Sequence, residues 1–287
     1  MRRIGITGAH GFVGSLLARR FLEAGWAVTQ LSHSASAGDG AAVPFRLGDE
    51  VSPEIFRSRN ITALVHCAYD FKPVGRAEIR RVNVDGSRKL LASAAAGGVQ
   101  RIAVTSTISA FEGCRSRYGQ AKLEIEAAAA AAGALVVRSG LVWADGPPSG
   151  GGMFGSLAKS VKARLVPLVG GGAYPQYLIH VQDLWELLRR FCDGEIQNPG
   201  KPVVAAAARP WPMRHLLAEL ARRQGTHPRF VSVPWQPVWA GLRLAEIVHV
   251  PVPYRSDSVV SLVYQDPKPE FGSLRGLGIV ARDFTVS

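Results

Sequence analysis

A tyrosine and a lysine four residues apart are the side chains of this sequence best suited to acid–base chemistry. Tyr118 and Lys122 stand in the segment Tyr-Gly-Gln-Ala-Lys, within a run that ends at Gly133. On a helix this spacing places both side chains on one face. An unperturbed tyrosine has a pKa of about 10, and a neighbouring ammonium favours the phenolate and lowers that pKa. Such a pair is also common on solvated helix faces, so its meaning depends on its surroundings.

Hydroxyl side chains upstream provide those surroundings. Ser106 and Thr107 follow a predicted strand over 101–105. The carboxyl ends of strands in a doubly wound sheet line the ligand crevice, so a hydroxyl there can polarise a carbonyl beside Tyr118. The alternative is a hydroxyl turn that only caps the strand.

A glycine-rich segment lies between the first predicted strand, 3–7, and a predicted helix, 15–24. Gly8 permits a tight turn, Gly11 lets the backbone approach a pyrophosphate, and Gly14 lets the helix pack against the strand. The helix N-terminus offers free N–H groups and the positive end of its dipole to an anion. The segment therefore indicates dinucleotide binding, and the alternative is a connection without a ligand.

The elements that must position these residues alternate along the first half of the chain. Short apolar runs predict strands and longer runs predict helices, at 3–7, 27–31, 61–68, 101–105 and 134–138 for strands and 15–24, 82–96 and 118–132 for helices. This alternation predicts an α/β fold with a doubly wound parallel (Rossmann) sheet.

Glycine and proline become frequent after the last of these strands, at 145–155 and 169–175. From Trp211 onward the sequence is helical with many prolines, which predicts a smaller, mostly helical C-terminal substrate lobe. We expect a dinucleotide-binding domain over 1–143, with 177–208 returning to it. The substrate-binding lobe is expected over 144–176 and 209–287.

Seven segments in this order resemble the extended short-chain dehydrogenase/reductase family, in its NAD-dependent epimerase/dehydratase group. They cover about two thirds of the chain. The segments are TGAHGFVG (7–14), LVHCA (64–68), VNVDGSRKLL (82–91), VTSTISAFEG (104–113), YGQAK (118–122), VRSGLVW (137–143) and IHVQDL (179–184).

The resemblance implies a role for each matching position. Tyr118 would be the acid–base residue, Lys122 its partner and a contact of the cofactor ribose, and Thr107 the catalytic hydroxyl. The cofactor-binding residues in the glycine segment would be Gly8, His10, Gly11, Phe12, Val13 and Gly14, of which Gly8, Gly11, Phe12 and Val13 would contact the pyrophosphate. The others would be Ser32 and His33 after the second strand, Asp49 and Glu50 at the adenine, Cys67, Ala68 and Tyr69 after the fourth strand, Asn83, Ser106 and Lys122 near the cofactor, and Ser139 and Gly140 bordering the nicotinamide.

The end of the second strand bears on the choice between NAD and NADP(H). It reads Gln30-Leu31-Ser32-His33-Ser34 and lacks the acidic residue that accepts from the ribose 2′-OH of NAD. The missing acidic residue therefore favours NADP(H) over NAD as the cofactor, although no arginine stands in this stretch. The alternative is that these are ordinary loop residues and NAD binds.

Three departures from the nucleotide-sugar members of the family concern the substrate. Leu141 stands where those members have asparagine, Gln176-Tyr177-Leu178 replaces their arginine, and the segment between Thr107 and Tyr118 is short. We expect an NAD(P)-dependent oxidoreductase of a carbonyl/alcohol pair, with a nucleotide-sugar epimerase, dehydratase or reductase included. The alternatives are a reductase of a non-sugar ketone or alcohol and a non-catalytic NAD(P)-binding sensor or scaffold.

Composition limits the remaining possibilities. The 287 residues are 47% hydrophobic and 20% charged, which suits a large packed core and excludes disorder. Three cysteines without a CxxC pair predict neither disulfides nor a metal site, and indicate the cytoplasm. The net charge of +12 comes from scattered arginines, so we expect a small-molecule substrate and no nucleic acid. No segment approaches the ~20 apolar residues of a membrane span, so no membrane partner is expected, and a homodimer is left open.

Overall fold

Seven parallel strands form the central sheet of the computed structural model, which describes residues 1–33, 42–146, 151–250, 252 and 254–284. Across the sheet their order is β11-β6-β5-β4-β1-β2-β3. The strands are β1 (Arg3–Thr7), β2 (Ala27–Ser32), β3 (Ala42–Pro44), β4 (Ala63–His66), β5 (Arg101–Thr107), β6 (Leu135–Ser139) and β11 (Val203–Ala205). The chain order reverses between β1 and β4, so the predicted doubly wound sheet is confirmed.

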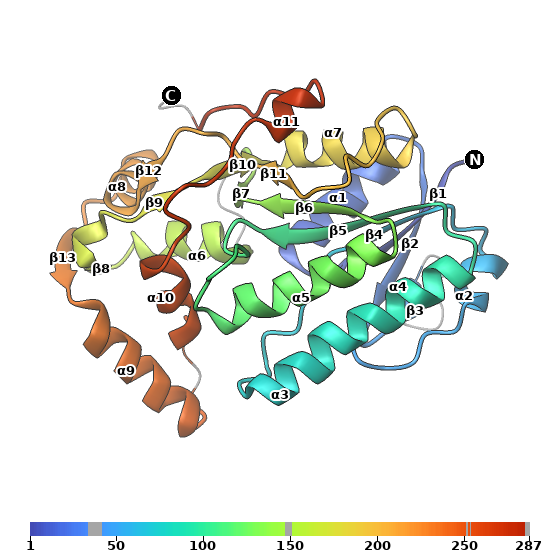
Figure 1. The fold of residues 1–287 in the computed structure, drawn as a ribbon. Coiled ribbons are helices and arrows are strands. Elements are labelled where there is room, and N and C mark those ends of the chain that lie inside the picture. Colours follow the sequence, from blue (N-terminus) through green and yellow to red (C-terminus); the bar gives the residue numbers. More distant parts are fainter. Residues whose placement is uncertain (34–41, 147–150, 251, 253, 285–287) are drawn as a thin grey trace.

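Helices cover both faces of this sheet (Figure 1). One face carries α1 (Phe12–Glu23) and α7 (Val181–Cys192), and the other carries α4 (Gly86–Ala96) and α5 (Arg117–Ala131). The strands between them are apolar on both sides, as parallel strands buried on two faces require, and β4 is buried throughout. Shorter helical segments accompany them, namely α2 (Glu54–Ser58), α3 (Arg76–Ile79) and the π-helical η1 (Arg80–Asp85), which leads into α4.

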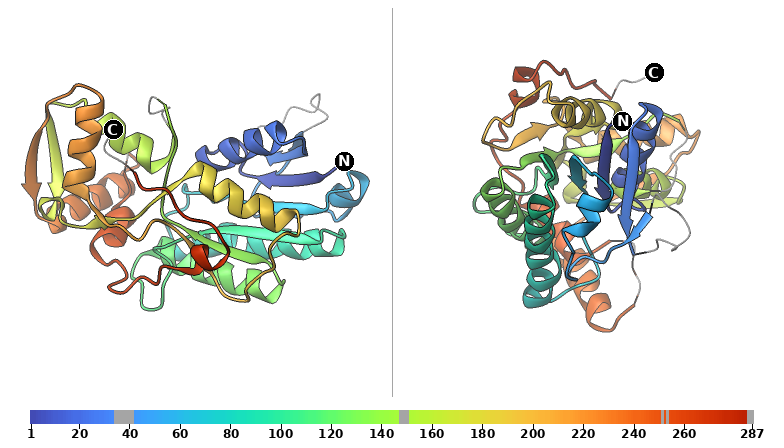
Figure 2. Two further views of the ribbon diagram at one scale, coloured as in Figure 1. Left: turned by 90° about the horizontal axis from the view of Figure 1, so that it is seen from above. Right: turned by 90° about the vertical axis from the view of Figure 1, so that its right-hand side faces the viewer.

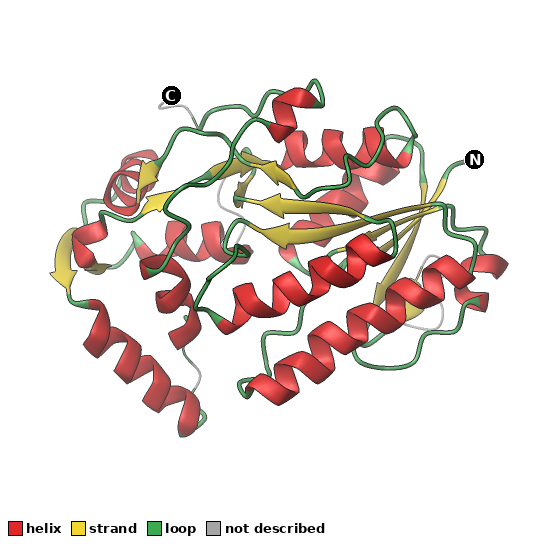
Figure 3. Ribbon diagram, in the orientation of Figure 1, coloured by secondary structure: helices red, strands yellow, loops and turns green. Residues whose placement is uncertain are grey.

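Three small two-stranded sheets, five α-helices and one short 3-10 helix make up most of the remaining described chain (Figure 3). The strand pairs are β10 with β7, β12 with β9 and β13 with β8. The elements are β7 (Leu141–Trp143), α6 (Gly152–Ser160), β8 (Leu165–Val169), η2 (Gly170–Gly172), β9 (Pro175–Gln176), β10 (Leu178–His180), β12 (Trp211–Pro212), α8 (Met213–Arg223), β13 (Arg229–Val233), α9 (Trp235–Ile247), α10 (Ser256–Val263) and α11 (Ser273–Gly276).

These elements have a hydrophobic core of their own. It includes Trp143, Leu157, Leu168, Leu216 and Phe284. Figure 2 shows this part of the molecule beside the layered sheet. The expected division into lobes stays a prediction. Part of it concerns 147–150, outside the described residues.

Two segments of the C-terminal half lie against the sheet. The β11 strand pairs with β6, and it falls within the range 177–208 that is expected to return to the dinucleotide-binding domain. Leu274 and Ile279 belong to the same core cluster as β1 and α1, although both fall within the range expected for the lobe. In the part of the chain that the structure describes, no helix is long and apolar enough to cross a membrane.

Candidate active site

One large cavity opens at the carboxyl ends of the central strands. Its volume is about 1270 Å³, and it extends from the glycine turn after β1 to α9 and α10. Ligand pockets typically measure about 300–1,000 Å³, so this cavity has room for an extended dinucleotide and a second molecule. It lies where the strand order reverses between β1 and β4, the position at which doubly wound folds bind ligands.

The glycine turn brings the first turn of α1 into this cavity. Gly8 has a φ of +67°, and an added Cβ would lie 2.9 Å from the Cα of Ala68. At Gly14 an added Cβ would overlap the carbonyl oxygen of Gly8, so helix and turn pack too closely for a side chain. Gly11, the N-cap, is extended, and an added Cβ there would contact only the Gly8 oxygen, at 3.2 Å. The helix N-terminus therefore fits a pyrophosphate, and its open approach is at Gly11.

A buried chain of hydrogen bonds fixes the loop after β4. The Thr7 hydroxyl accepts from the backbone N–H groups of Cys67 and Ala68 and lies 2.7 Å from Nδ1 of His66. Nε2 of His66 lies 2.9 Å from the Ser87 hydroxyl. Burial, reinforced by the Lys122 charge, lowers the pKa of His66 to about 3, so the ring is neutral. This histidine is a structural link across the switch point.

The same loop is held a second time by Asn83. Its side-chain oxygen accepts from the backbone N–H of Asp70 at 2.7 Å, and its amide donates to the Asp70 carbonyl at 2.9 Å. Asn83 is fully buried and does not line the cavity. It therefore supports the cavity wall formed by Cys67, Ala68 and Tyr69.

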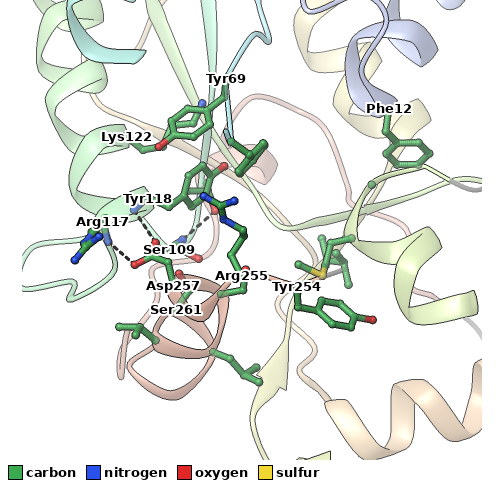
Figure 4. Close-up of a pocket in the computed structure, with 18 of the residues that line it drawn as sticks. Phe12, Tyr69, Ser109, Arg117, Tyr118, Lys122, Tyr254, Arg255, Asp257 and Ser261 are labelled. Atoms are coloured by element: carbon green, nitrogen blue, oxygen red, sulfur yellow. Dashed lines mark hydrogen bonds between the residues drawn. The ribbon is translucent and has the colours of Figure 1, made fainter. Parts of the chain in front are cut away.

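Tyr118 lies in the first turn of α5, inside the cavity (Figure 4). Its ring packs edge-on to Tyr69, with centroids 4.9 Å apart, and against Phe71 at 5.6 Å. Burial raises the pKa of Tyr118 to about 12, and a side-chain hydrogen bond with Thr107 lowers it in part. Burial therefore sets the direction of this pKa shift, and the expected lowering of the Tyr118 pKa by Lys122 stays a prediction.

Asp257 of α10 caps the helix that carries Tyr118. Its carboxylate accepts from the backbone N–H groups of Arg117 at 2.8 Å and Tyr118 at 2.9 Å. Ser116 is the N-cap and accepts from the Gly119 N–H at 3.1 Å. A carboxylate at a helix N-terminus satisfies unpaired donors and complements the dipole. The C-terminal part of the chain therefore sets the position of Tyr118.

Lys122 is buried one turn further along α5. Its ammonium donates to the carbonyl oxygen of Thr105 at 2.9 Å and lies 5.1 Å from the centre of the Tyr69 ring. Burial lowers the pKa of Lys122 to about 8, although the buried carboxylate of Glu126 opposes this shift. The side chain is therefore charged at neutral pH and faces the cavity.

A buried ion pair supports the end of β5. Glu126 binds Arg138 through two oxygens, at 2.7 Å to Nη2 and 3.0 Å to Nε, and accepts from the Ser106 hydroxyl. Thr107 lines the cavity one residue later, and its hydroxyl accepts from the Ser109 N–H. The pair holds the strand end that presents Thr107 to Tyr118.

Two side chains at the far end of the cavity suit the adenosine half of a dinucleotide. Ser32 is 5% exposed, and its hydroxyl has no partner within the described chain. The Phe45 N–H donates to the Ser32 carbonyl, so Arg46 follows beside the end of β2 and lines the cavity. His33 also lines it, whereas Ser34 lies outside the described residues. This end therefore combines an unpaired buried hydroxyl with a guanidinium.

The opposite end of the cavity is largely apolar. Its lining includes Leu157, Val166, Leu168, Leu217, Val238 and Leu242. The arginines there already make contacts. Arg243 and Arg255 pair with Glu246, Arg117 donates to the Val74 carbonyl, and Arg115 stacks over Tyr264. A substrate with a large apolar part fits this end better than a diphosphate does.

The cavity collects most of the residues that the sequence singles out. Those that line it are Gly8, His10, Gly11, Phe12, Val13, Gly14, Ser32, His33, Cys67, Ala68, Tyr69, Ser106, Thr107, Tyr118, Lys122, Ser139 and Gly140. Asp49 and Glu50 do not, and Glu50 pairs with Lys89. Within the described ranges no cluster of His, Cys, Asp or Glu could hold a metal ion.

Sequence reasoning missed three residues of this site, namely Arg46, Glu126 and Asp257. The position of Arg46 depends on the register of β2 against β3, and that of Asp257 on the packing of α10 on α5. Of the three, only Glu126 could have been found from the sequence, because it lies four residues after Lys122 and therefore on the same helix face.

Comparison with known proteins gives a family and a fold. A model of the NAD dependent epimerase/dehydratase family matches residues 4–201. A ceramide reductase of Caulobacter vibrioides is 29% identical over 196 residues, which are 66% of this chain and 60% of that protein. A Synechocystis protein with the provisional name dihydroflavonol 4-reductase is 32% identical over 112 residues, 37% of this chain and 33% of its own. The matches thus span only part of both relatives.

Solved structures show the same fold at low identity. A UDP-glucose 4-epimerase of Thermotoga maritima, solved with UDP-glucose, aligns with a TM-score of 0.68 and 21% identity over 81% of this chain and 85% of its own. A dTDP-glucose 4,6-dehydratase of Bacillus anthracis, solved with NAD, aligns with a TM-score of 0.64 and 15% identity over the same shares. At these identities the likeness concerns the fold alone.

Proposed function

The chain belongs to the NAD-dependent epimerase/dehydratase family, and on this basis we propose that it reduces the carbonyl group of a substrate with a large apolar part, using NADPH. The observation that carries the proposal is the position of Tyr118, whose half-buried side chain lines the cavity beside Thr107 and has a pKa of about 12. A group with this pKa keeps its proton at neutral pH, so it suits a proton donor better than a base.

Each residue of the site has a separate role in such a reduction. The cofactor, when bound, supplies the hydride. Tyr118 donates its proton to the substrate oxygen, and Thr107 hydrogen-bonds the same oxygen. Lys122 places a positive charge within the site and stabilises the phenolate that the proton transfer leaves behind. The rings of Tyr69 and Phe71 pack against the Tyr118 ring and so fix its orientation in the cavity.

The adenosine end favours NADPH over NADH. The unpaired hydroxyl of Ser32 and the guanidinium of Arg46 suit a 2′-phosphate, and no acidic residue stands at the end of β2 to repel it. Arginine supplies the positive charge that the end of β2 itself lacks.

Three observations support an apolar substrate. The end of the cavity near α9 is lined by leucine and valine side chains, and its arginines are engaged within the protein. The matched relative from Caulobacter carries the name ceramide reductase, and a ceramide is an amphiphile with long apolar chains. A keto group on an amphiphilic lipid is therefore our proposed substrate class.

The three free thiols, Cys67, Cys114 and Cys192, suit a reducing compartment such as the cytoplasm.

Mass spectrometry of ligands released from the freshly purified protein tests this function. We expect the released ligand to be NADP(H). In a separate activity assay, we expect the protein to oxidise NADPH when long-chain keto compounds are added. An NAD that stays bound and returns to its starting redox state during isomerisation of a nucleotide sugar would refute the proposal. Cofactor binding without turnover of either class would favour the sensor instead.

A further inference from the structure

The helix α9 carries its charged and apolar residues in an unusual arrangement. A surface helix normally turns its charged residues outward and its apolar stripe toward the core. In α9 the two charged residues, Arg243 and Glu246, face inward. The Glu246 side chain is 4% exposed, pairs with Arg243 at 3.2 Å and accepts from the N–H and hydroxyl of Ser256.

Apart from Gln236 and His249, the exposed side chains of α9 and of the residues just after it are apolar. We call this apolar surface the α9 face, and it consists of Trp239, Leu244, Ile247, Val248 and Val250. Their exposed fractions are 38%, 61%, 59%, 57% and 52%. Of the twelve large hydrophobic residues exposed in the described chain, these five fall within twelve consecutive positions. Single exposed apolar residues are ordinary, but such a cluster marks a surface that binds something.

The α9 face adjoins the apolar end of the cavity. Val238, Trp239 and Leu242 of the same helix line that cavity, and so does Phe71, which is 59% exposed. In Figure 1 α9 reaches away from the sheet and ends at the lower edge of the molecule, to which the N-terminal end of α3 also extends. A molecule that covers this face therefore lies at the mouth of the site.

The charge around the face favours an anionic occupant. Arg255 contacts Glu246 on the inner side of α9 and donates to the carbonyl oxygens of Lys72 and Pro73, which brings the loop before α3 to the same region. This loop carries the exposed Lys72, and α3 begins with Arg76, which donates to the Gln120 side chain, and also carries Glu78. The chain as a whole has a net charge of +12. Apolar side chains flanked by cations are typical of helices that lie in the interface of an anionic bilayer.

We propose that the α9 face docks on the surface of an anionic lipid bilayer, with α9 lying in the plane of the membrane and the cavity mouth turned toward it. The 13 residues of α9 are too short to span a bilayer but sufficient to bury one apolar face in it. The sequence-based expectation of no membrane partner considered only spans. The inference goes beyond the proposed reaction, since docking requires neither cofactor nor catalysis.

Vesicle flotation with the full chain tests the docking. We expect the protein to float with vesicles of phosphatidylcholine and phosphatidylglycerol, and to bind less to phosphatidylcholine alone or at high salt. The double variant Leu244→Glu/Ile247→Glu should weaken vesicle binding by about tenfold or more, since two charges enter the apolar layer. Both positions are exposed, so the fold, checked by circular dichroism, should persist.

A matched control and a second measurement separate the outcomes. The variant Leu22→Glu/Val280→Glu changes two side chains with exposed fractions of 52% and 70% elsewhere on the surface, and should bind vesicles like the wild type. Absence of flotation, or equal binding by the two double variants, would overturn the inference. Light scattering after gel filtration that shows a dimer abolished only by Leu244→Glu/Ile247→Glu would also overturn it, because a second copy would then cover the face.

Discussion

Replacing Lys122 with methionine should stabilise the protein while it abolishes reduction. Lys122 is 4% exposed, and burial lowers its pKa from 10.5 to about 8. A folded protein that lowers the pKa of a lysine disfavours its charged form, so the ammonium costs free energy of folding at neutral pH. Methionine has a similar unbranched chain and carries no charge.

The size of the effect follows from that pKa. Each pKa unit corresponds to about 1.4 kcal/mol, so the shift amounts to a penalty of about 3 kcal/mol. The hydrogen bond from Lys122 to the Thr105 carbonyl is lost in the variant, at a cost of about 1 kcal/mol. The net gain at pH 7 is about 2 kcal/mol, or an increase in Tm of about 5 °C for a chain of this size.

The effect also has a defined pH dependence. Between pH 8 and 10.5 the unfolded wild type binds more protons at Lys122 than the folded protein does, so the stability of the wild type rises with pH across this window. The variant lacks the titrating group, and its advantage should shrink and then vanish by pH 10.5.

Thermal and urea unfolding of the ligand-free proteins from pH 7 to 10.5 measure this difference. Lys162→Met, at an exposed lysine, is the control and should change stability by less than about 0.5 kcal/mol. A Lys122→Met variant less stable than the wild type at pH 7, or a difference that does not change with pH, would refute the reasoning.

Three further predictions concern the frame of the site and its cofactor. Asp257→Ala removes the acceptor of two N–H groups at the start of α5, so it should lower kcat about 10- to 100-fold with little change in the Kd of NADPH. The control Asp85→Ala, at a surface ion pair, should leave kcat unchanged. Steady-state kinetics measure kcat, and fluorescence titration measures the Kd of NADPH. Gly14→Ala should destabilise the fold by about 2 kcal/mol or more in urea unfolding, because its Cβ would overlap the backbone of the glycine turn. The double variant Ser32→Asp/Arg46→Ser should prefer NADH over NADPH, and calorimetry that finds the wild-type order unchanged would remove both residues from the 2′-phosphate site.

The sequence predicts those parts of the fold and site that depend on local pattern. The strand before Gly8 and the helix after it are visible as an apolar run and a glycine spacing, and the structure has β1 and α1 there. The helix predicted over 118–132 is α5 at 117–131, because Ser116 caps it and alanine fills its second half. Local pattern also placed Thr107 at the end of β5.

Features that depend on long-range packing were beyond the sequence. Asp257 contacts the backbone of Tyr118 across 139 positions, and no spacing rule connects the two. The raised pKa of Tyr118 follows from burial against Tyr69 and Phe71, which a sequence does not report. The direction in which α9 turns its charges is likewise set by Ser256 and Arg255 of the following segment.

Single-turnover oxidation of NADPH by Tyr118→Phe, measured with a long-chain keto substrate identified for the wild type, tests the central claim most directly. The variant keeps the aromatic ring and loses only the proton donor, so we expect the rate to fall by about 10²- to 10⁴-fold. The Kd of NADPH should remain within about twofold, since the phenol contributes the proton and not the affinity for the cofactor. A Tyr264→Phe control, at a tyrosine outside the cavity lining, should react like the wild type. A Tyr118→Phe protein that keeps most of the wild-type rate would contradict the account.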